Sequence, residues 1–166
     1  MSSKSTSLAK GDWIVHTFYG VGQIISIEKK KIGEDQNKYF KVEARNSTFF
    51  VPVDNVDADR IRPIASKYML RKAINTLKDR PQQLDTDHTQ RKRQISVMLN
   101  DPSLVTNAIL VRDLRARRDE FGLNDHEENT LDKMTKRLVR EWAIAQDIEP
   151  GQAMEKFETV MNEKNN

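Results

Sequence analysis

The sequence GDWIVHTFYGVGQIISIE, residues 11–28, decides the first half of the fold. Two apolar runs, 13–15 and 21–27, flank a turn-rich centre, and their Val and Ile residues favour an extended backbone. Gly20 and Gly22 permit the positive φ or the close backbone approach that a tight turn or a bulge requires. The stretch therefore predicts the first two strands of a small, strongly bent β-module.

More strand signals follow this stretch. Residues 33–37 are turn formers, and residues 38–44 then alternate apolar with charged side chains, which is the period of a half-buried strand. Residues 48–51 are strand-like up to Pro52, and a polar loop follows at 54–59. Four or five short strands in about 50 residues predict a small Tudor- or SH3-like barrel, a kind of module that mostly binds other molecules.

The apolar spacing changes from strand to helix at Ser66, which can cap a first helix that ends before Pro81. Further helices are predicted at 89–99, from Asp101 as cap with Pro102 in the first turn to Gly122, from Asn124 or Asp125 through Trp142, and over 153–161. The third helix is predicted to carry Arg112, Arg115, Arg117 and Arg118 on its outer face. The predicted fold class is therefore α+β, with a flexible tail at 1–9, a Tudor-like barrel at 10–63 and a compact all-α domain of about five helices at 66–161.

Composition limits the classes to which this chain can belong. It holds 37% hydrophobic and 32% charged residues and 0 Cys, which excludes a disulfide framework, a Cys-ligated zinc site and a thiol nucleophile. No apolar run approaches the roughly 20 residues of a membrane span. Residues 1–10 lack the apolar core of a signal peptide. We therefore expect a cytoplasmic protein, and we expect it to be a monomer.

The positive charge is concentrated in the middle of the chain. Residues 63–118 hold 12 Lys and Arg against 5 Asp and Glu, a net charge of +7, whereas residues 1–62 carry +2 and residues 119–166 carry −6. A polyanion such as nucleic acid is the natural partner of a segment with this charge. A solvated helix surface with scattered cations has the same composition, so charge alone leaves both interpretations open.

The sequence shows no catalytic constellation. His16, His88 and His126 are far apart and lack the spacing of metal ligands. The sequence Gly20-Val21-Gly22 is too short for a dinucleotide-binding loop and is not followed by a helix. We therefore expect a protein that is not an enzyme and that holds no metal and no cofactor.

Arg91, Lys92 and Arg93 are the densest group of cations in the basic segment. On a helix they fan over roughly 200°, so a groove or phosphate edge would meet two of them but not all three equally. No zinc finger, RNP-type aromatic pattern or clear recognition helix accompanies them. We therefore expect backbone or shape recognition with weak base specificity.

Several blocks of the chain form a specific pattern when they are taken together. They are Gly11-Asp12-Trp13-Ile14-Val15-His16, Tyr19-Gly20-Val21-Gly22-Gln23-Ile24, Ile27-Glu28, Tyr39-Phe40, Val51-Pro52-Val53, Ile61-Arg62, Val111-Arg112-Asp113-Leu114, Gly122-Leu123 and the helix through Leu138 and Glu141. The combination resembles the CarD/CdnL family of bacterial transcription regulators across nearly the whole chain. The first blocks alone would also fit the polymerase-binding module of the transcription-repair coupling factor, which shares this fold.

The resemblance implies a Tudor-like N-terminal domain that docks on the β1 lobe of the bacterial RNA polymerase β subunit. It also implies a helical C-terminal domain that touches promoter DNA at the upstream edge of the transcription bubble and stabilises the open complex. In the family, docking uses a sheet edge and basic residues near the end of the second strand. Lys30 falls at one such position, with Lys29 and Lys31 beside it. The predicted docking residues are therefore Lys29, Lys30, Lys31, Phe49, Phe50 and Val51. Phe50 falls where relatives can carry an arginine, so that contact would be apolar here or made differently.

The resemblance places the DNA contacts at His88, Gln90, Arg91, Lys92 and Arg93. Many family members have a tryptophan where this chain has His88, and that tryptophan wedges into the minor groove. An imidazole buries less area than an indole, so the contact here would rely more on Arg91 and Arg93. Two other interpretations stay open: an adaptor that binds polymerase without functional DNA contact, and a Tudor-like RNA-binding module.

Overall fold

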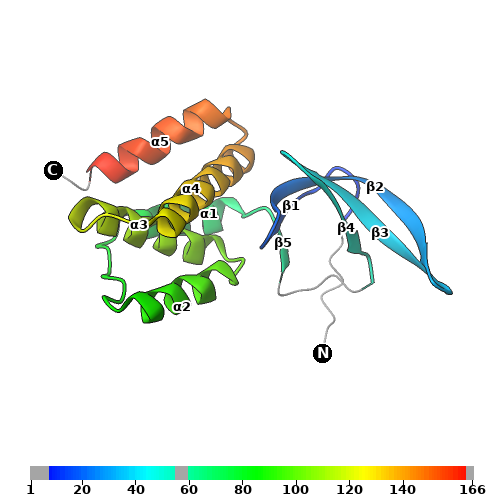
Figure 1. The fold of residues 1–166 in the computed structure, drawn as a ribbon. Helices are drawn as coiled ribbons and strands as arrows, with labels where there is room; N and C mark the ends of the chain where they lie inside the picture. The colour runs from blue at the N-terminus through cyan, green and yellow to red at the C-terminus, as the bar shows by residue number, and fades with distance from the viewer. Residues whose placement is uncertain (1–7, 55–59, 164–166) are drawn as a thin grey trace. The chain divides into compact units, whose positions relative to one another are not determined.

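The computed structural model describes residues 8–54 and 60–163 (Figure 1). The chain divides into two compact units, with the boundary between Ile64 and Ala65. The first unit is built from strands and the second from helices, which confirms the predicted α+β class. Most of the predicted tail, residues 1–7, and most of the predicted polar loop, residues 55–59, lie outside the described residues.

The described strands of the first unit form one antiparallel sheet. Its strands are β1 (Trp13–His16), β2 (Gly20–Ile32), β3 (Asp35–Ala44), β4 (Thr48–Pro52) and β5 (Ile61–Pro63). Their order in the sheet is β4-β3-β2-β1-β5. Among the described residues the ladder does not close into a barrel, so β4 and β5 are the two edges of a five-stranded sheet.

Two glycines shape the hairpin of β1 and β2. Gly20 takes a φ of 79°, which a turn of this kind requires and which other residues rarely adopt. Gly22 lies in β2 between Ile14 and Ala44 on the neighbouring strands. A Cβ on Gly22 would lie 2.7 Å from Cγ1 of Val42, so only glycine lets the strands approach this closely.

The hairpin of β2 and β3 is longer than the sequence predicts (Figure 1). Lys29, Lys30 and Lys31 belong to β2, and residues 35–37 belong to β3. The predicted turn at 33–37 is therefore too long, and the chain reverses between Ile32 and Asp35, with Gly33 at a φ of 65°. Pairing along the whole hairpin keeps the three lysines on an extended strand.

Apolar side chains on one face of the sheet form the core of the first unit. These are Ile14, Ile24, Phe40, Val42, Ala44, Phe49, Val51 and Ile61. The alternation of buried with exposed residues along β3 and β4 is the pattern expected when one face packs and the other meets solvent. The opposite face therefore presents the residues between them, Phe50 and Lys41 included.

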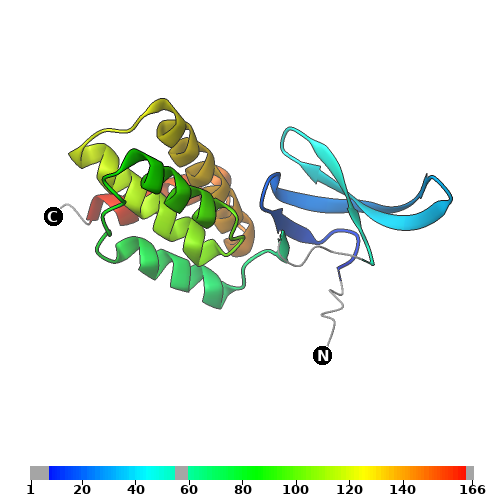
Figure 2. The same ribbon diagram turned by 60° about the horizontal axis from the view of Figure 1, so that its bottom comes forward.

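In the described part of the second unit, residues 65–163, the chain forms five helices, as predicted. They are α1 (Lys67–Lys78), α2 (His88–Leu99), α3 (Leu104–Glu120), α4 (Asp125–Gln146) and α5 (Pro150–Glu163). Helix α3 packs against α1, α2 and α4, and Figure 2 shows it among them. Its residues Leu104, Ala108, Leu110, Val111 and Leu114 are buried in the core that all five helices share.

Local caps define two helix starts as predicted. The Ser66 side chain accepts a hydrogen bond from the N–H of Met69 at the start of α1. The Asn124 side chain accepts from the N–H of Glu127 at the start of α4, and the Glu127 side chain accepts from the N–H of Asn124. These reciprocal bonds form a capping box, which satisfies backbone donors that the first helical turn leaves unpaired.

Other helix starts differ from the prediction. Asp101 does not cap α3, which begins at Leu104 after Ser103. The Asp101 carboxylate instead accepts hydrogen bonds from the N–H of Ser103 at 2.9 Å and from the hydroxyl of Thr106 at 2.7 Å. The last helix is predicted over 153–161, but α5 begins at Pro150, a position where a missing N–H costs nothing.

The prediction that Arg112 lies on the outer face of α3 is wrong. Arg112 is buried, and its Nε donates to the carboxylate of Asp113 at 2.9 Å. Its Nη1 donates to the carbonyl of Thr76 in α1 at 3.2 Å, and Asp113 also accepts from the N–H of Gln82 at 3.0 Å. The pair therefore ties α3 to the end of α1 and to the loop that follows it.

Candidate functional site

The outer face of the sheet brings together two residues that the sequence analysis singled out. The Nζ of Lys30 lies 3.0 Å from the centre of the Phe50 ring, a cation–π contact. Phe50 is 36% exposed, so the ring is available to a partner even with the lysine above it. On the same face, Phe50 lies opposite Lys41, which forms an ion pair with Glu28 at 3.9 Å. We call Lys30 and Phe50 the Lys30–Phe50 corner.

The backbone of β4 is a sheet edge next to this corner. Towards β3, the N–H of Val53 donates to the carbonyl of Lys38 at 3.0 Å, and the N–H of Ala44 donates to the carbonyl of Ser47 at 2.8 Å. Hydrogen-bonded residues alternate along an antiparallel strand, so residues 47, 49, 51 and 53 face β3. Thr48 and Phe50 therefore turn their N–H groups away from the sheet.

The other predicted docking residues divide into exposed and buried ones. Lys29 and Lys31 are exposed on β2. Phe49 is 6% exposed and Val51 is 5% exposed, because both face the core of the sheet. The Phe49 ring stacks on Tyr19 with ring centres 4.4 Å apart. Phe49 and Val51 can therefore support β4 from within but do not offer a partner their side chains.

Helix α2 presents four of the five predicted DNA-contacting residues to solvent. His88, Gln90, Lys92 and Arg93 are exposed. Arg91 is only 6% exposed and is not on the solvent side of the helix. The reason is its spacing, since Arg91 lies four residues before Ile95 and so shares the inward face with that buried side chain. The four-residue spacing of Arg91 and Ile95 can be read from the sequence. The prediction instead treated Arg91, Lys92 and Arg93 as one group of surface cations.

Arg91 joins three segments of the helical unit. Its Nε donates to Oε2 of Glu127 in α4 at 2.7 Å, and both side chains are nearly inaccessible to solvent. Its Nη1 donates to the carbonyls of Asp85 at 3.1 Å and Thr86 at 3.2 Å, in the loop before α2. Arg91 therefore fixes the start of α2, and with it His88, relative to α4.

Glu127 is the partner that sequence reasoning missed. The Asn-x-x-Glu spacing of Asn124 and Glu127 indicates a capping box, but nothing in it points to Arg91. Burial raises the pKa of Glu127, whereas the hydrogen bonds from Arg91 and from the N–H of Asn124 lower it. Taken together, the interactions that lower the pKa outweigh the effect of burial. The pKa of Glu127 therefore lies below its ordinary value, and the carboxylate stays ionised opposite Arg91.

Within residues 8–54 and 60–163, no three His, Asp or Glu side chains lie close enough together to hold a metal ion. In the same part of the chain, none of the helices is long and apolar enough to span a membrane.

Comparison with known families identifies both units. The CarD-like/TRCF RID domain matches residues 8–65, and the CarD C-terminal domain matches residues 72–158. The chain belongs to the CarD family. It is therefore a non-catalytic transcription factor that interacts with RNA polymerase, and the resemblance inferred from the sequence is confirmed.

Individual relatives of this CarD family member agree with the family match. The chain is 25% identical over 140 residues to the "Putative transcription factor YdeB" of Bacillus subtilis (strain 168), which covers 83% of this chain and 92% of that protein. It is 38% identical over 48 residues to the transcription-repair-coupling factor of Staphylococcus aureus (strain USA300), which covers 28% of this chain and 4% of that protein. The first match is too long for either unit alone, so it spans both.

Acid is expected to weaken the helical unit of this CarD family member through Glu127. The folded-state pKa of Glu127 is lowered, so the stabilisation is present above the unfolded-state pKa of roughly 4.3 and is lost as the pH falls through the folded-state pKa. Glu127→Gln removes this titration. The difference in free energy of unfolding between wild type and Glu127→Gln should therefore shrink between about pH 6 and about pH 3. Urea denaturation at several pH values measures it, and a constant difference would contradict the assignment.

Proposed function

We propose that this CarD family protein binds the β1 lobe of the RNA polymerase β subunit and contacts promoter DNA at the upstream edge of the transcription bubble. In this role it acts as a monomer in the cytoplasm, at the nucleoid, and stabilises the open complex during initiation. The observation that carries the proposal is the outward-facing edge of β4 beside the Lys30–Phe50 corner.

Docking uses strand addition. A strand of the polymerase pairs with the edge of β4, where the N–H groups of Thr48 and Phe50 face outward, and main-chain hydrogen bonds supply affinity. The Phe50 ring supplies an apolar contact next to this edge. Lys29, Lys30 and Lys31 favour an acidic rim on the partner, because exposed charges steer association and discriminate between partners.

Two substitutions at Phe50 separate the contribution of the backbone N–H on the β4 edge from that of the aromatic ring. Phe50→Ala removes the ring and keeps the N–H, whereas Phe50→Pro removes both. Proline is tolerated on an edge strand where the N–H faces outward, so the sheet should survive. We expect Phe50→Pro to bind the isolated β1 lobe roughly tenfold more weakly than Phe50→Ala, the cost of one lost hydrogen bond in an interface. Biolayer interferometry measures this ratio.

Equal affinities for Phe50→Ala and Phe50→Pro would show that the backbone edge of β4 does not pair with polymerase. Circular dichroism of both variants checks that the sheet is retained. If the wild-type protein does not bind the β1 lobe at all, the docking proposal fails as a whole.

The proposed DNA contact depends on the docking of the first unit on polymerase. Docking on polymerase holds the helical unit near the bubble at a high effective concentration, so a weak intrinsic affinity for DNA suffices. The exposed side chains of His88, Gln90, Lys92 and Arg93 make the contact, and Arg91 positions the helix that carries them. If the helical unit binds melted promoter DNA more tightly than closed duplex DNA, its binding shifts the population toward the open complex.

An adaptor without functional DNA contact is the second candidate. The observation in its favour is the exposed Asp85 and Asp87 just before His88, since two negative charges oppose contact with phosphates. His88→Ala distinguishes the candidates in a promoter-output assay. Unchanged output would favour the adaptor, whereas reduced output would favour the DNA contact.

A further inference from the structure

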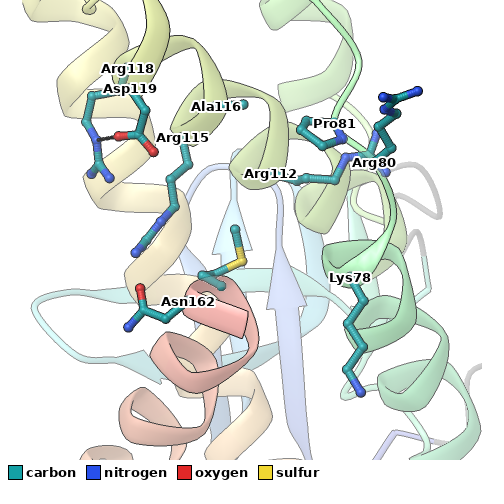
Figure 3. A pocket seen from close by; sticks show the side chains of 10 residues that line it. Lys78, Arg80, Pro81, Arg112, Arg115, Ala116, Arg118, Asp119 and Asn162 are labelled. Carbon is teal, nitrogen blue, oxygen red and sulfur yellow. Dashed lines mark hydrogen bonds and ion pairs between the residues drawn. The ribbon is translucent and has the colours of Figure 1, made fainter. Parts of the chain in front are cut away.

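The helical unit contains a cationic pocket that neither proposed surface uses. It has a volume of about 660 Å³ and opens between the end of α1, the second half of α3 and the end of α5. Its polar lining is formed mainly by Lys78, Arg80, Arg112, Arg115, Arg118 and Asn162 (Figure 3). Asp119 is the single acidic residue in this lining.

Two of the arginines are held in place within the wall. Arg112 is fixed by Asp113 and by the carbonyl of Thr76. Arg115 donates two hydrogen bonds to the carboxylate of Glu158 in α5, at 3.1 and 2.7 Å. The charges of these two arginines are therefore largely matched, and their side chains are held in fixed positions in the lining.

The other three cations of the lining are less constrained. Lys78 and Arg80 are exposed, and neither has an acidic side chain within ion-pair distance in the part of the chain that the structure describes. Arg118 meets its neighbour Asp119 at 3.3 Å, with both side chains largely exposed, and such pairs contribute little. The lining therefore has an excess of positive charge, and these three side chains carry it.

Helix dipoles explain only part of this arrangement. Lys78 and Arg118 lie in the last turns of α1 and α3, where a cation offsets the partial negative charge of the helix end. Arg80 lies beyond α1, and Arg115 lies more than a turn before the end of α3, so neither has this role. Helix dipoles therefore do not account for the presence of Arg80 and Arg115 in the lining of one pocket.

We propose that this pocket binds a small anion that carries two or more linked phosphate groups. Guanidinium groups match phosphate oxygens in pairs, and lysine adds a mobile point charge. The volume lies in the range of small-molecule sites, and the cations come from two segments of the chain, residues 78–80 and helix α3. Figure 3 shows Arg115 extending from α3 toward Asn162 of α5, so the two polar side chains lie on the same side of the pocket. The same phosphate chemistry could come from a DNA backbone, and the test distinguishes the two sources.

Inorganic tripolyphosphate is the probe for this site. Calorimetric titration of the full chain at low salt should show a single saturable site that weakens as salt is added. Lys78→Glu with Arg80→Glu should weaken binding about tenfold or more, because two charge-assisted contacts become repulsions. The matched control is Lys67→Glu with Arg71→Glu, which makes the same charge change at exposed positions of α1 outside the pocket. This control should bind as the wild type does.

A second arm measures binding of duplex DNA by the same variants. We expect the Lys78 and Arg80 double variant to lose tripolyphosphate binding while it keeps the DNA affinity of the control. Equal losses of tripolyphosphate and DNA would overturn the proposal, because the pocket would then belong to a DNA surface. Equal binding of tripolyphosphate by the two double variants would also overturn it. The neutral pair Lys78→Gln with Arg80→Gln gives the same comparison if the charge reversals disturb folding.

Discussion

Replacing Arg91 with methionine is expected to lower the free energy of unfolding of the helical unit by about 3–5 kcal/mol. The Nε of Arg91 lies 2.7 Å from Oε2 of Glu127, and the two side chains are 8% and 5% exposed. Removing the cation leaves a buried carboxylate without its partner, and that uncompensated charge is the main cost. The carbonyls of Asp85 and Thr86 lose a donor as well. Chemical denaturation followed by circular dichroism measures the loss.

Two further variants test this explanation. Lys92→Met makes the same change at the exposed neighbouring position, and we expect its effect to stay within about 0.5 kcal/mol. Adding Glu127→Gln to Arg91→Met should recover part of the loss, because no buried charge then remains unpaired. If Arg91→Met were no worse than Lys92→Met, Arg91 would not be the link between α2 and α4.

Reversing the charges of Lys92 and Arg93 together is expected to shorten the lifetime of the open complex about tenfold or more. Both side chains are exposed on α2, so each loses a phosphate contact and gains a repulsion. Affinity for polymerase should not change, because the proposed docking edge belongs to β4 in the other unit. Competitor-challenged transcription on a linear promoter measures the lifetime, and a pull-down measures the affinity.

The choice of residues for this double variant depends on the structure. The sequence favoured Arg91 and Arg93, but a variant of Arg91 would lose stability and so confuse a folding defect with a lost DNA contact. Lys67→Glu with Arg71→Glu serves as the control of equal charge change. A lifetime that matches this control would remove the DNA contact and leave the adaptor as the function.

The elements of this protein were largely predictable because they depend on neighbours in the sequence. The turn at Gly20 and the Ser66 cap follow from residues within a few positions of each other. The capping box of Asn124 and Glu127 is local in the same way. The prediction failed where one side chain could take either of two local roles. Asp101 was predicted to cap a helix, but its carboxylate accepts hydrogen bonds from Ser103 and Thr106 instead.

The candidate surfaces were predictable only in part. Lys30 and Phe50 were both singled out from the resemblance, yet their contact joins β2 and β4 across the sheet and could not be inferred from either strand. The alternation of buried and exposed residues in β4 could have removed Phe49 and Val51 from the docking side chains. The edge position of β4 depends on the order of strands, which no single strand determines.

By itself, the sequence determined the α+β class, the hairpin around Gly20 and Gly22, the approximate positions of five helices and the membership of the CarD family. Only the tertiary structure decided which cations are available to a partner. Arg91 and Arg112 look like surface charges because they lie in basic runs, but Glu127 and Asp113 hold them inside. Lys78 and Arg115 lie far apart in the chain, and both line one pocket. The physical reason is that burial and ion pairing depend on packing between distant segments, whereas capping, turns and periodicity depend on nearby residues.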